Sequence, residues 1–166
     1  MDNKIFKKQS ATCNCINLRR ASQAITEVYD EMLSESGIKV SQYLLLNNIK
    51  KLGPISVSNL ALEIRLDRTT IVRNLKPLEE KGFIIDVANK GTRSRQLKLT
   101  DKGFEVLEKA TPLWLAAQNF IEQYLGKEEM NTFTVLLSKI EALVPWFFYY
   151  IVDEPLEFSK NNKLVC

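Results

Sequence analysis

The stretch that decides the fold runs from Asp67 to Gly82 and reads DRTTIVRNLKPLEEKG. Asp67 is a suitable N-cap, because its carboxylate can accept hydrogen bonds from the unpaired N–H groups of a first helical turn. Gly82 suits the left-handed residue that commonly ends a helix. Ile71, Leu75 and Leu78 fall at i, i+4 and i+7, so they share one face that must be buried. The stretch therefore predicts a helix with an apolar inner face.

The other side of this predicted helix is basic and rich in hydrogen-bonding groups. It carries Arg68, Thr69, Arg73, Asn74 and Lys76. Side chains of these types pair with phosphates and hydrogen-bond the edges of bases. Two interpretations fit the helix taken alone: a DNA-recognition helix, or an ordinary surface helix with a solvated charged face.

Basic residues are concentrated around this helix. The 166-residue chain has a net charge of only +3. Residues 65–102 hold ten Lys or Arg against five Asp or Glu, a net of +5, so the remainder carries −2. A basic central segment in a nearly neutral chain is typical of a phosphate-binding surface.

The elements around the helix predict a winged helix-turn-helix. A short helix is expected to start at Ser56 or Val57, and only about three residues, Arg65-Leu66-Asp67, separate it from the recognition-type helix. After the helix, segments 83–87 and 96–100 have the composition of two strands that pair as a hairpin. The loop between them carries three basic residues that can reach a neighbouring minor groove: Lys90, Arg93 and Arg95. The alternative is a solvated surface hairpin.

Longer amphipathic helices are expected on both sides of this unit. We expect helices over about 12–36, 42–52 with Ser41 as the cap, 101–125 and 127–151. The last of these carries more apolar surface than one helix usually buries in a monomer, and long amphipathic helices often pack against a partner helix. Pro77 is expected to kink the recognition-type helix without ending it, because Leu78 continues the apolar phase.

The predicted fold class is mainly α with a small β-wing: a winged helix-turn-helix plus long dimerisation helices. The expected organisation has four parts: an N-terminal segment and dimerisation helix at 1–36, the DNA-binding domain at 37–100, C-terminal dimerisation helices at 101–152, and a polar tail at 153–166.

The composition argues against several classes of function. The chain has no histidine, which removes His-based acid–base catalysis, Ser-His or Cys-His nucleophiles and His-ligated metal sites. It shows no phosphate-cradling glycine loop and no paired-acid site, so we expect no enzyme, no cofactor and no metal. Three cysteines are too few for a disulfide scaffold. No apolar run could span a membrane and no signal-peptide pattern is present, so a cytoplasmic protein without membrane association is expected.

In its order of elements, the chain resembles the MarR family of bacterial and archaeal transcriptional regulators, over roughly residues 18–143. Its motifs stand at Leu60-Ala61, Leu66–Leu75, Leu78–Gly82 and Leu97–Gly103. The resemblance implies a homodimer whose first helix and last two helices form the interface. Such a dimer presents two winged helices to a pseudo-palindromic operator in double-stranded DNA, with half-sites about one helical turn apart. It usually acts as a repressor.

The resemblance also implies roles for individual residues. Thr69, Thr70 and Arg73 match positions of the recognition helix that meet bases and phosphates, and Ser56 and Arg68 match phosphate contacts. Arg93 matches the wing arginine that enters the minor groove, with Arg95 as the alternative register. The chain departs from the pattern at Gly91, where the family commonly has an aspartate that braces the wing.

Many family members release DNA when a small phenolic or lipophilic molecule binds, and others respond to cysteine oxidation. The aromatic residues that could line an apolar effector pocket here are Tyr29, Tyr43, Trp114 and Phe120, although aromatics at helical spacing are more often plain core. Cys13 and Cys15 form the candidate redox pair, since a helix N-terminus and nearby arginines lower the pKa of a thiol. The other interpretation is that both cysteines are buried or incidental.

Two classes of function remain open on the sequence. The first is a dimeric, sequence-specific DNA-binding regulator relieved by a ligand or by oxidation. The second is a winged-helix module that binds another protein and has no operator of its own. DNA affinity that falls steeply with salt distinguishes the first from the second.

Overall fold

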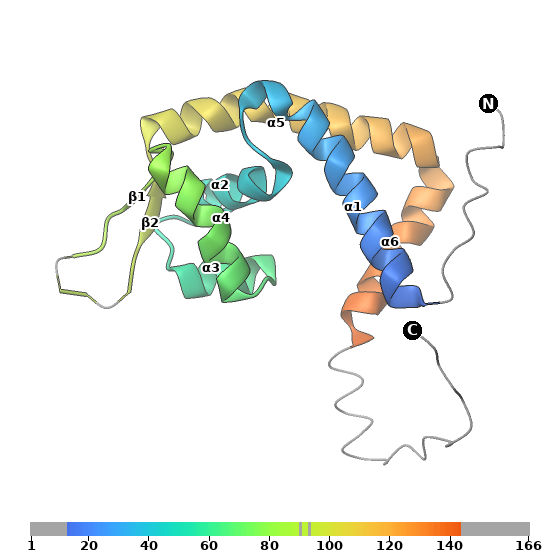
Figure 1. The fold of residues 1–166 in the computed structure, drawn as a ribbon, viewed down its shortest axis with the longest axis horizontal. Coiled ribbons are helices and arrows are strands. Elements are labelled where there is room, and N and C mark those ends of the chain that lie inside the picture. The colour runs from blue at the N-terminus through green and yellow to red at the C-terminus, as the bar shows by residue number, and fades with distance from the viewer. Residues whose placement is uncertain (1–12, 90, 93, 144–166) are drawn as a thin grey trace, which may run out of the picture. The chain divides into compact units, whose positions relative to one another are not determined.

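The computed structural model describes residues 13–89, 91–92 and 94–143 as helices and one small hairpin (Figure 1). The elements are α1 (Asn14–Met32), the 3₁₀ turn η1 (Ser34–Ser36), α2 (Val40–Leu52), α3 (Val57–Ile64), α4 (Arg68–Glu80), β1 (Ile84–Asp86), β2 (Leu97–Leu99), α5 (Asp101–Leu125) and α6 (Lys127–Glu141). The chain divides into two compact units, residues 22–118 and residues 1–21 with 119–166. The predicted fold class, mainly helical with a two-stranded wing, is confirmed.

The hydrophobic core of the 22–118 unit forms around α2, α3, α4 and the wing. Leu60 and Leu78 are completely buried, and Ile71 and Leu75 are 1% exposed. Full burial of such a side chain is worth roughly 1.5–3 kcal/mol. The apolar face predicted for α4 is therefore the face that packs into this core.

The helix-turn-helix forms as the sequence predicts. Ser56 is the N-cap of α3, and its Oγ accepts the N–H of Asn59 at 3.1 Å. Arg65 ends α3 in the left-handed conformation with φ +56°. Asp67 then caps α4 by accepting the N–H of Thr70 at 2.8 Å. The turn between the two helices is therefore short and closed by a cap on each side.

The recognition-type helix α4 continues through Pro77 to Glu80, although proline cannot donate to the carbonyl of Arg73. Leu78 beyond the proline is completely buried, which keeps the apolar face in phase. The helix gives way to the wing at Gly82, which has φ +70°. Both the continuation past Pro77 and the end at Gly82 match the prediction.

The wing is an antiparallel hairpin in which Ile84 lies opposite Leu99 and Asp86 opposite Leu97 (Figure 1). Each strand is three residues long, shorter than the predicted segments. Regular strand pairing ends at Asp86. Its carboxylate accepts hydrogen bonds from the N–H groups of Ala88 and Gln96. Ile55 and Leu97 also exchange two backbone hydrogen bonds, which fasten the hairpin to the segment before α3.

The start of the chain differs from the prediction in two respects. Helix α1 ends at Met32, and the turn η1 and the left-handed Gly37 fill the stretch that was expected to be helical. Helix α2 begins at Val40, so Ser41 lies inside it and is not its cap. The reason is tertiary, because Asp30 accepts the N–H of Val40 at 2.8 Å from ten residues earlier.

Helix α5 is continuous through Pro112 and starts at a hydroxyl cap. The Oγ1 of Thr100 accepts the N–H of Gly103 at 3.0 Å and donates to the carbonyl of Gly82 at 2.7 Å. The hydroxyl of Thr100 therefore connects Gly82, just after α4, to the first turn of α5. The predicted helix 127–151 is described as far as Glu141, and its residues from 144 onward, like the tail 153–166, lie outside the described residues.

Gly103→Ala is predicted to destabilise the winged-helix unit. A β-carbon at Gly103 would lie 2.0 Å from the carbonyl oxygen of Phe83, so α5 must move away from the wing. Overpacking of this kind typically costs about 1–3 kcal/mol. Urea unfolding followed by circular dichroism measures the change, with Glu105→Ala at an exposed site of the same helix as the control. Equal midpoints for both variants would contradict the packing described here.

Candidate nucleic-acid interface

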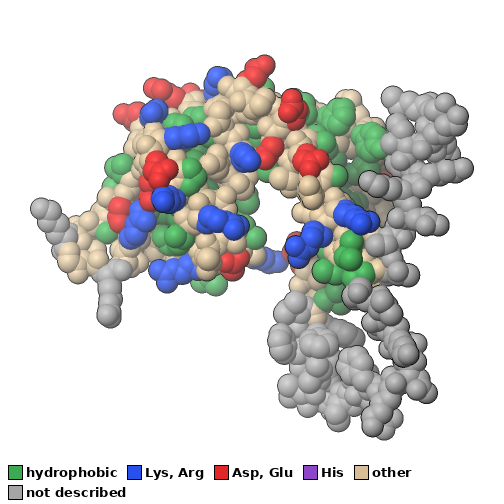
Figure 2. Space-filling view, in the orientation of Figure 1, with side chains coloured by type: hydrophobic (Ala, Val, Ile, Leu, Met, Phe, Trp, Pro, Cys, Tyr) green, Lys and Arg blue, Asp and Glu red, His purple; other side chains and the backbone are tan. Residues whose placement is uncertain are grey.

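The candidate interface is the exposed face of α4. Thr69, Val72, Arg73 and Lys76 are all exposed, and their spacings of three and four residues place them on one side of the helix. Arg68 is exposed at the first helical position. Figure 2 shows Lys and Arg side chains over the part of the surface formed by α3 and α4. The arrangement presents cations and hydroxyls to solvent along the helix.

Lys76 has a partner on its own helix. Its Nζ lies 3.9 Å from a carboxylate oxygen of Glu80, and the two side chains are 77% and 64% exposed. A pair this exposed contributes only about 0.3–0.5 kcal/mol. Lys76 can therefore exchange Glu80 for a phosphate at little cost.

Thr70 and Asn74 are turned toward the protein. Hydrogen bonding with Thr70 holds the pKa of the Asp67 carboxyl below its ordinary value. The amide of Asn74 donates to the carbonyl of Thr70 at 2.9 Å and accepts from the hydroxyl of Ser41 on α2 at 3.1 Å. Both residues are half-buried. Asn74 connects α4 to α2, whereas the contacts of Thr70 are with the N-cap Asp67 and with Asn74 of the same helix.

Arg95 is held at the base of the wing by two carboxylates. Its Nε lies 3.1 Å from Asp86 of β1, and its guanidinium also pairs with Glu79 of α4. Backbone N–H groups of Gln96 and Ala88, together with Arg95, lower the pKa of the Asp86 carboxyl. The wing is thus anchored to the C-terminal half of α4. The sequence did not identify Glu79 and Asp86 as site residues. Neither acid belongs to a motif, and only the folded structure brings them to Arg95.

The position where the family commonly has an aspartate adopts a conformation that suits glycine. Gly91 has φ +91°, and beside it the N–H of Thr92 donates to the carbonyl of Asn89 at 3.1 Å. A side chain at 91 would be strained there. The ion pairs of Arg95 with Glu79 and Asp86 lie nearer the base of the wing than Gly91 does. Two predicted contacts of the tip, Lys90 and Arg93, lie outside the described residues.

Three of the candidate effector residues, Tyr29, Tyr43 and Trp114, belong to the 22–118 unit. The rings of Tyr43 and Trp114 stack with their centroids 5.4 Å apart. The hydroxyl of Tyr29 donates a hydrogen bond to the side-chain oxygen of Gln118. Phe120 belongs to the other compact unit and is 51% exposed. The stacked pair is packed into the core of the winged-helix unit, as the plainer interpretation of these aromatics expects.

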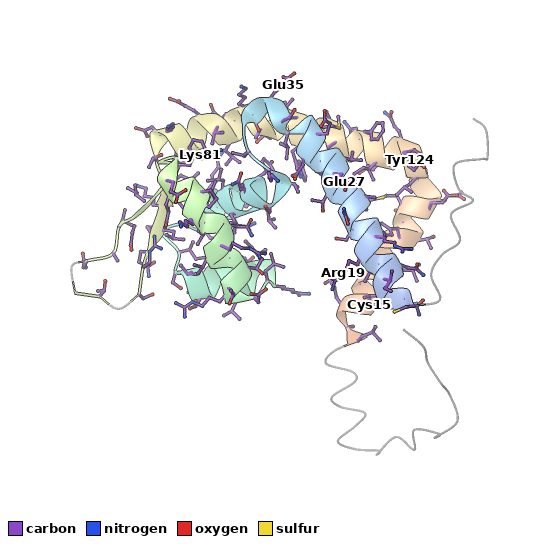
Figure 3. The ribbon with its side chains drawn as sticks, viewed as in Figure 1. Cys15, Arg19, Glu27, Glu35, Lys81 and Tyr124 are labelled. Atoms are coloured by element: carbon purple, nitrogen blue, oxygen red, sulfur yellow. The ribbon has the colours of Figure 1, made fainter. Side chains whose placement is uncertain are left out.

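Cys13 and Cys15 lie at the start of α1, with Cys13 half-buried and Cys15 exposed. Cys15 lies one helical turn before Arg19 (Figure 3). Within residues 13–89, 91–92 and 94–143, no group of three or more metal-ligating side chains occurs. In the same part of the chain, no helix is both long and apolar enough to cross a membrane.

Comparisons with known proteins identify this arrangement. The family model described as MarR family matches residues 38–91, which run from the start of α2 to the wing. The M. tuberculosis transcriptional regulator MosR, solved in complex with DNA, is 32% identical with a TM-score of 0.67, over 79% of this chain and 98% of MosR. The chain belongs to the MarR family.

Two further relatives agree with this assignment. An HTH-type transcriptional regulator of Bacillus cereus is 27% identical over 126 residues, which are 75% of this chain and 84% of the relative. PcaV from Streptomyces coelicolor, solved with its natural ligand, shares the fold with a TM-score of 0.69 at 23% identity, over 80% of this chain and 97% of PcaV. MarR-family members are DNA-binding transcriptional regulators and not enzymes, as the sequence predicted.

Asp67→Ala is predicted to destabilise the fold in a pH-dependent manner. Because hydrogen bonding lowers the folded-state pKa, the carboxylate stabilises the fold above its unfolded pKa of about 3.9 and loses this contribution as pH falls through the folded value. The difference in unfolding free energy between wild type and variant should therefore shrink between about pH 5 and pH 2. Asp67→Asn retains a capping oxygen and is the control. A difference that does not change with pH would refute the role of the charge.

Arg95→Ala is predicted to loosen the wing while leaving the core intact. Amide hydrogen exchange should rise at Ile85 and Val87 and stay unchanged in α2, because the side chain joins the wing to α4 and lies outside the core. Lys98→Ala, at an exposed position of β2, is the matched control. Unchanged exchange in the wing of Arg95→Ala would show that the brace does not hold it.

Proposed function

We propose that this MarR-family regulator is a dimeric repressor that reads a pseudo-palindromic operator with the exposed face of α4. The observation that carries the proposal is that α4 buries Ile71, Leu75 and Leu78 and leaves Thr69 and Arg73 exposed. The N-terminal residues of such a recognition helix contact base edges in the major groove. The basic charge of segment 65–102 supplies the phosphate attraction.

We propose three roles for the predicted DNA-binding residues. Exposed Thr69 and Arg73 are proposed to contact bases, while Arg68, Lys76 and the helix cap Ser56 contact phosphates. Thr70 and Asn74, whose polar groups are engaged within the fold, are proposed to position α4.

The wing is proposed to use Arg93 and Lys90. Arg95 is already paired with Glu79 and Asp86, so we assign it the task of fixing the base of the wing. A narrow minor groove attracts arginine because of its concentrated negative potential. Of the two registers left open by the sequence, this favours Arg93 as the residue that enters the groove.

Dimerisation is proposed through the unit formed by 1–21 and 119–166. Neither α6 nor α1 contains a fully buried residue. Eight large apolar side chains of this unit are at least 39% exposed: Ile16, Leu18, Phe120, Tyr124, Val135, Leu136, Ile140 and Leu143. So large an exposed apolar surface usually marks an interface. The proposed interface lies within the ranges 1–36 and 101–152, with DNA binding in 37–100 and a polar tail outside the interface at 153–166.

Relief of repression is proposed to occur either through a small apolar or phenolic ligand or through oxidation of Cys13 or Cys15. For the ligand, the Tyr43–Trp114 stack is relevant because it connects α2 to α5, and α2 also reaches α4 through Ser41. For oxidation, the exposure of Cys15 is the supporting observation. Either signal must bind or modify the DNA-competent and incompetent states differently to shift their populations.

The second candidate is a winged-helix module that binds another protein. The basic outer face of α4 favours DNA, since lysine and arginine side chains neutralise the phosphate charge of the DNA backbone. In the protein-binding case, Arg73→Ala would leave DNA affinity unchanged.

Arg73→Ala is predicted to lower affinity for the selected operator by about tenfold or more and to relax base preference at one position per half-site. Arg93→Ala is predicted to weaken binding across many sequences. Titrations of fluorescent DNA at several salt concentrations measure both effects, and Arg93→Ala should also reduce the salt slope. The DNA is first selected from a random pool with the wild-type protein.

The control is Lys50→Ala at an exposed position of α2, outside the proposed interface. It should bind as wild type does. Equal operator affinity of wild type, Arg73→Ala and Arg93→Ala would remove these assignments. Binding that does not depend on salt would argue against the proposed function as a whole.

A further inference from the structure

One exposed side chain of α4 cannot form hydrogen bonds with DNA. Val72 is 49% exposed and is followed directly by Arg73. Thr69 precedes it by three residues and Lys76 follows it by four, so all four side chains belong to the same surface of the helix. Val72 is thus an apolar position within a basic and hydrogen-bonding face.

Exposure of a single apolar residue is common on protein surfaces and by itself indicates nothing. The position of Val72 is more informative. It lies about 100° around the helix from Ile71, which faces the core and is 1% exposed. Val72 is also in the N-terminal half of α4, the part of a recognition helix that approaches base edges. A side chain there meets bases in the proposed complex.

The chemistry of the major groove restricts what an apolar side chain can recognise. Each base pair presents hydrogen-bond donors and acceptors there, and the C5-methyl of thymine is the apolar group. Valine is branched at Cβ and holds essentially one rotamer in a helix, so its two methyl groups are already fixed in place. Contact with a thymine methyl removes apolar surface from water on both sides.

We propose that Val72 determines sequence specificity by packing against the C5-methyl group of one thymine in each operator half-site. Arg73 and Thr69 supply the neighbouring polar contacts, and Arg68 and Lys76 hold the phosphates. The proposal rests on the proposed function, in which α4 lies in the major groove. It adds a base preference that hydrogen-bonding residues alone do not give.

The test uses full-length protein and an operator selected from a random DNA pool by the wild type. Each thymine of one half-site is replaced in turn by deoxyuridine, which removes only the methyl group. One replacement is expected to weaken wild-type binding roughly fourfold, the value for losing one buried methyl. Val72→Ala is expected to bind the thymine and deoxyuridine operators equally well. Val72→Ile, which keeps the branch and adds a methylene, should retain a preference for thymine.

The matched control is Val87→Ala, a valine outside α4 that is 40% exposed. It should keep the full wild-type difference between thymine and deoxyuridine. Since Val72 is half-exposed, Val72→Ala should fold normally, which circular dichroism checks.

The proposal is overturned if wild type tolerates deoxyuridine at every position, or if Val72→Ala keeps the wild-type difference. In both cases salt-dependent operator binding would leave the proposed function standing. Failure of wild type to select or bind any DNA would remove both proposals. If Val72→Ala instead loses affinity for a protein partner and no thymine preference exists, the surface is a protein-docking site.

Discussion

The burial of Ile71, Leu75 and Leu78 is the constraint on which the rest of the molecule depends. These side chains are at most 1% exposed and pack α4 onto the core formed with α2, α3 and the wing. A helix has one rotation about its axis that buries such a stripe. That rotation leaves Thr69, Val72 and Arg73 facing outward, so the energy of the core orients the surface that is proposed to read DNA.

Polar contacts then hold α4 and the wing, the two elements proposed to bind DNA, in place. The hydroxyl of Ser41 on α2 donates a hydrogen bond to Asn74 of α4, and Arg95 of the wing forms an ion pair with Glu79 of α4. Surface ion pairs are individually weak, but each of these contacts connects elements far apart in sequence. The apolar core therefore fixes the rotation of α4, while the polar contacts connect α4 to α2 and to the wing.

The two compact units suit different tasks. The 22–118 unit contains the core, the helix-turn-helix and the wing, and the MarR family model matches residues 38–91 within it. The unit of 1–21 and 119–166 leaves apolar side chains such as Val135 and Leu136 half-exposed. These exposed apolar side chains are the basis for the proposal that the second unit packs against another subunit, while the 22–118 unit is proposed to bind DNA.

The sequence by itself determined the helix-turn-helix, the wing and the exposed face of α4. Caps, periodicity and turn residues act over a few neighbours, so the cap Asp67, the left-handed Gly82 and a start of α3 at Ser56 or Val57 could be predicted without coordinates. Tertiary structure decided the start of α2, where Asp30 replaces the expected Ser41 cap, and the roles of Asn74 and Arg95. A polar side chain can face either DNA or the protein, and its neighbours decide which. Sequence periodicity does not identify those neighbours, because they come close only when the chain folds.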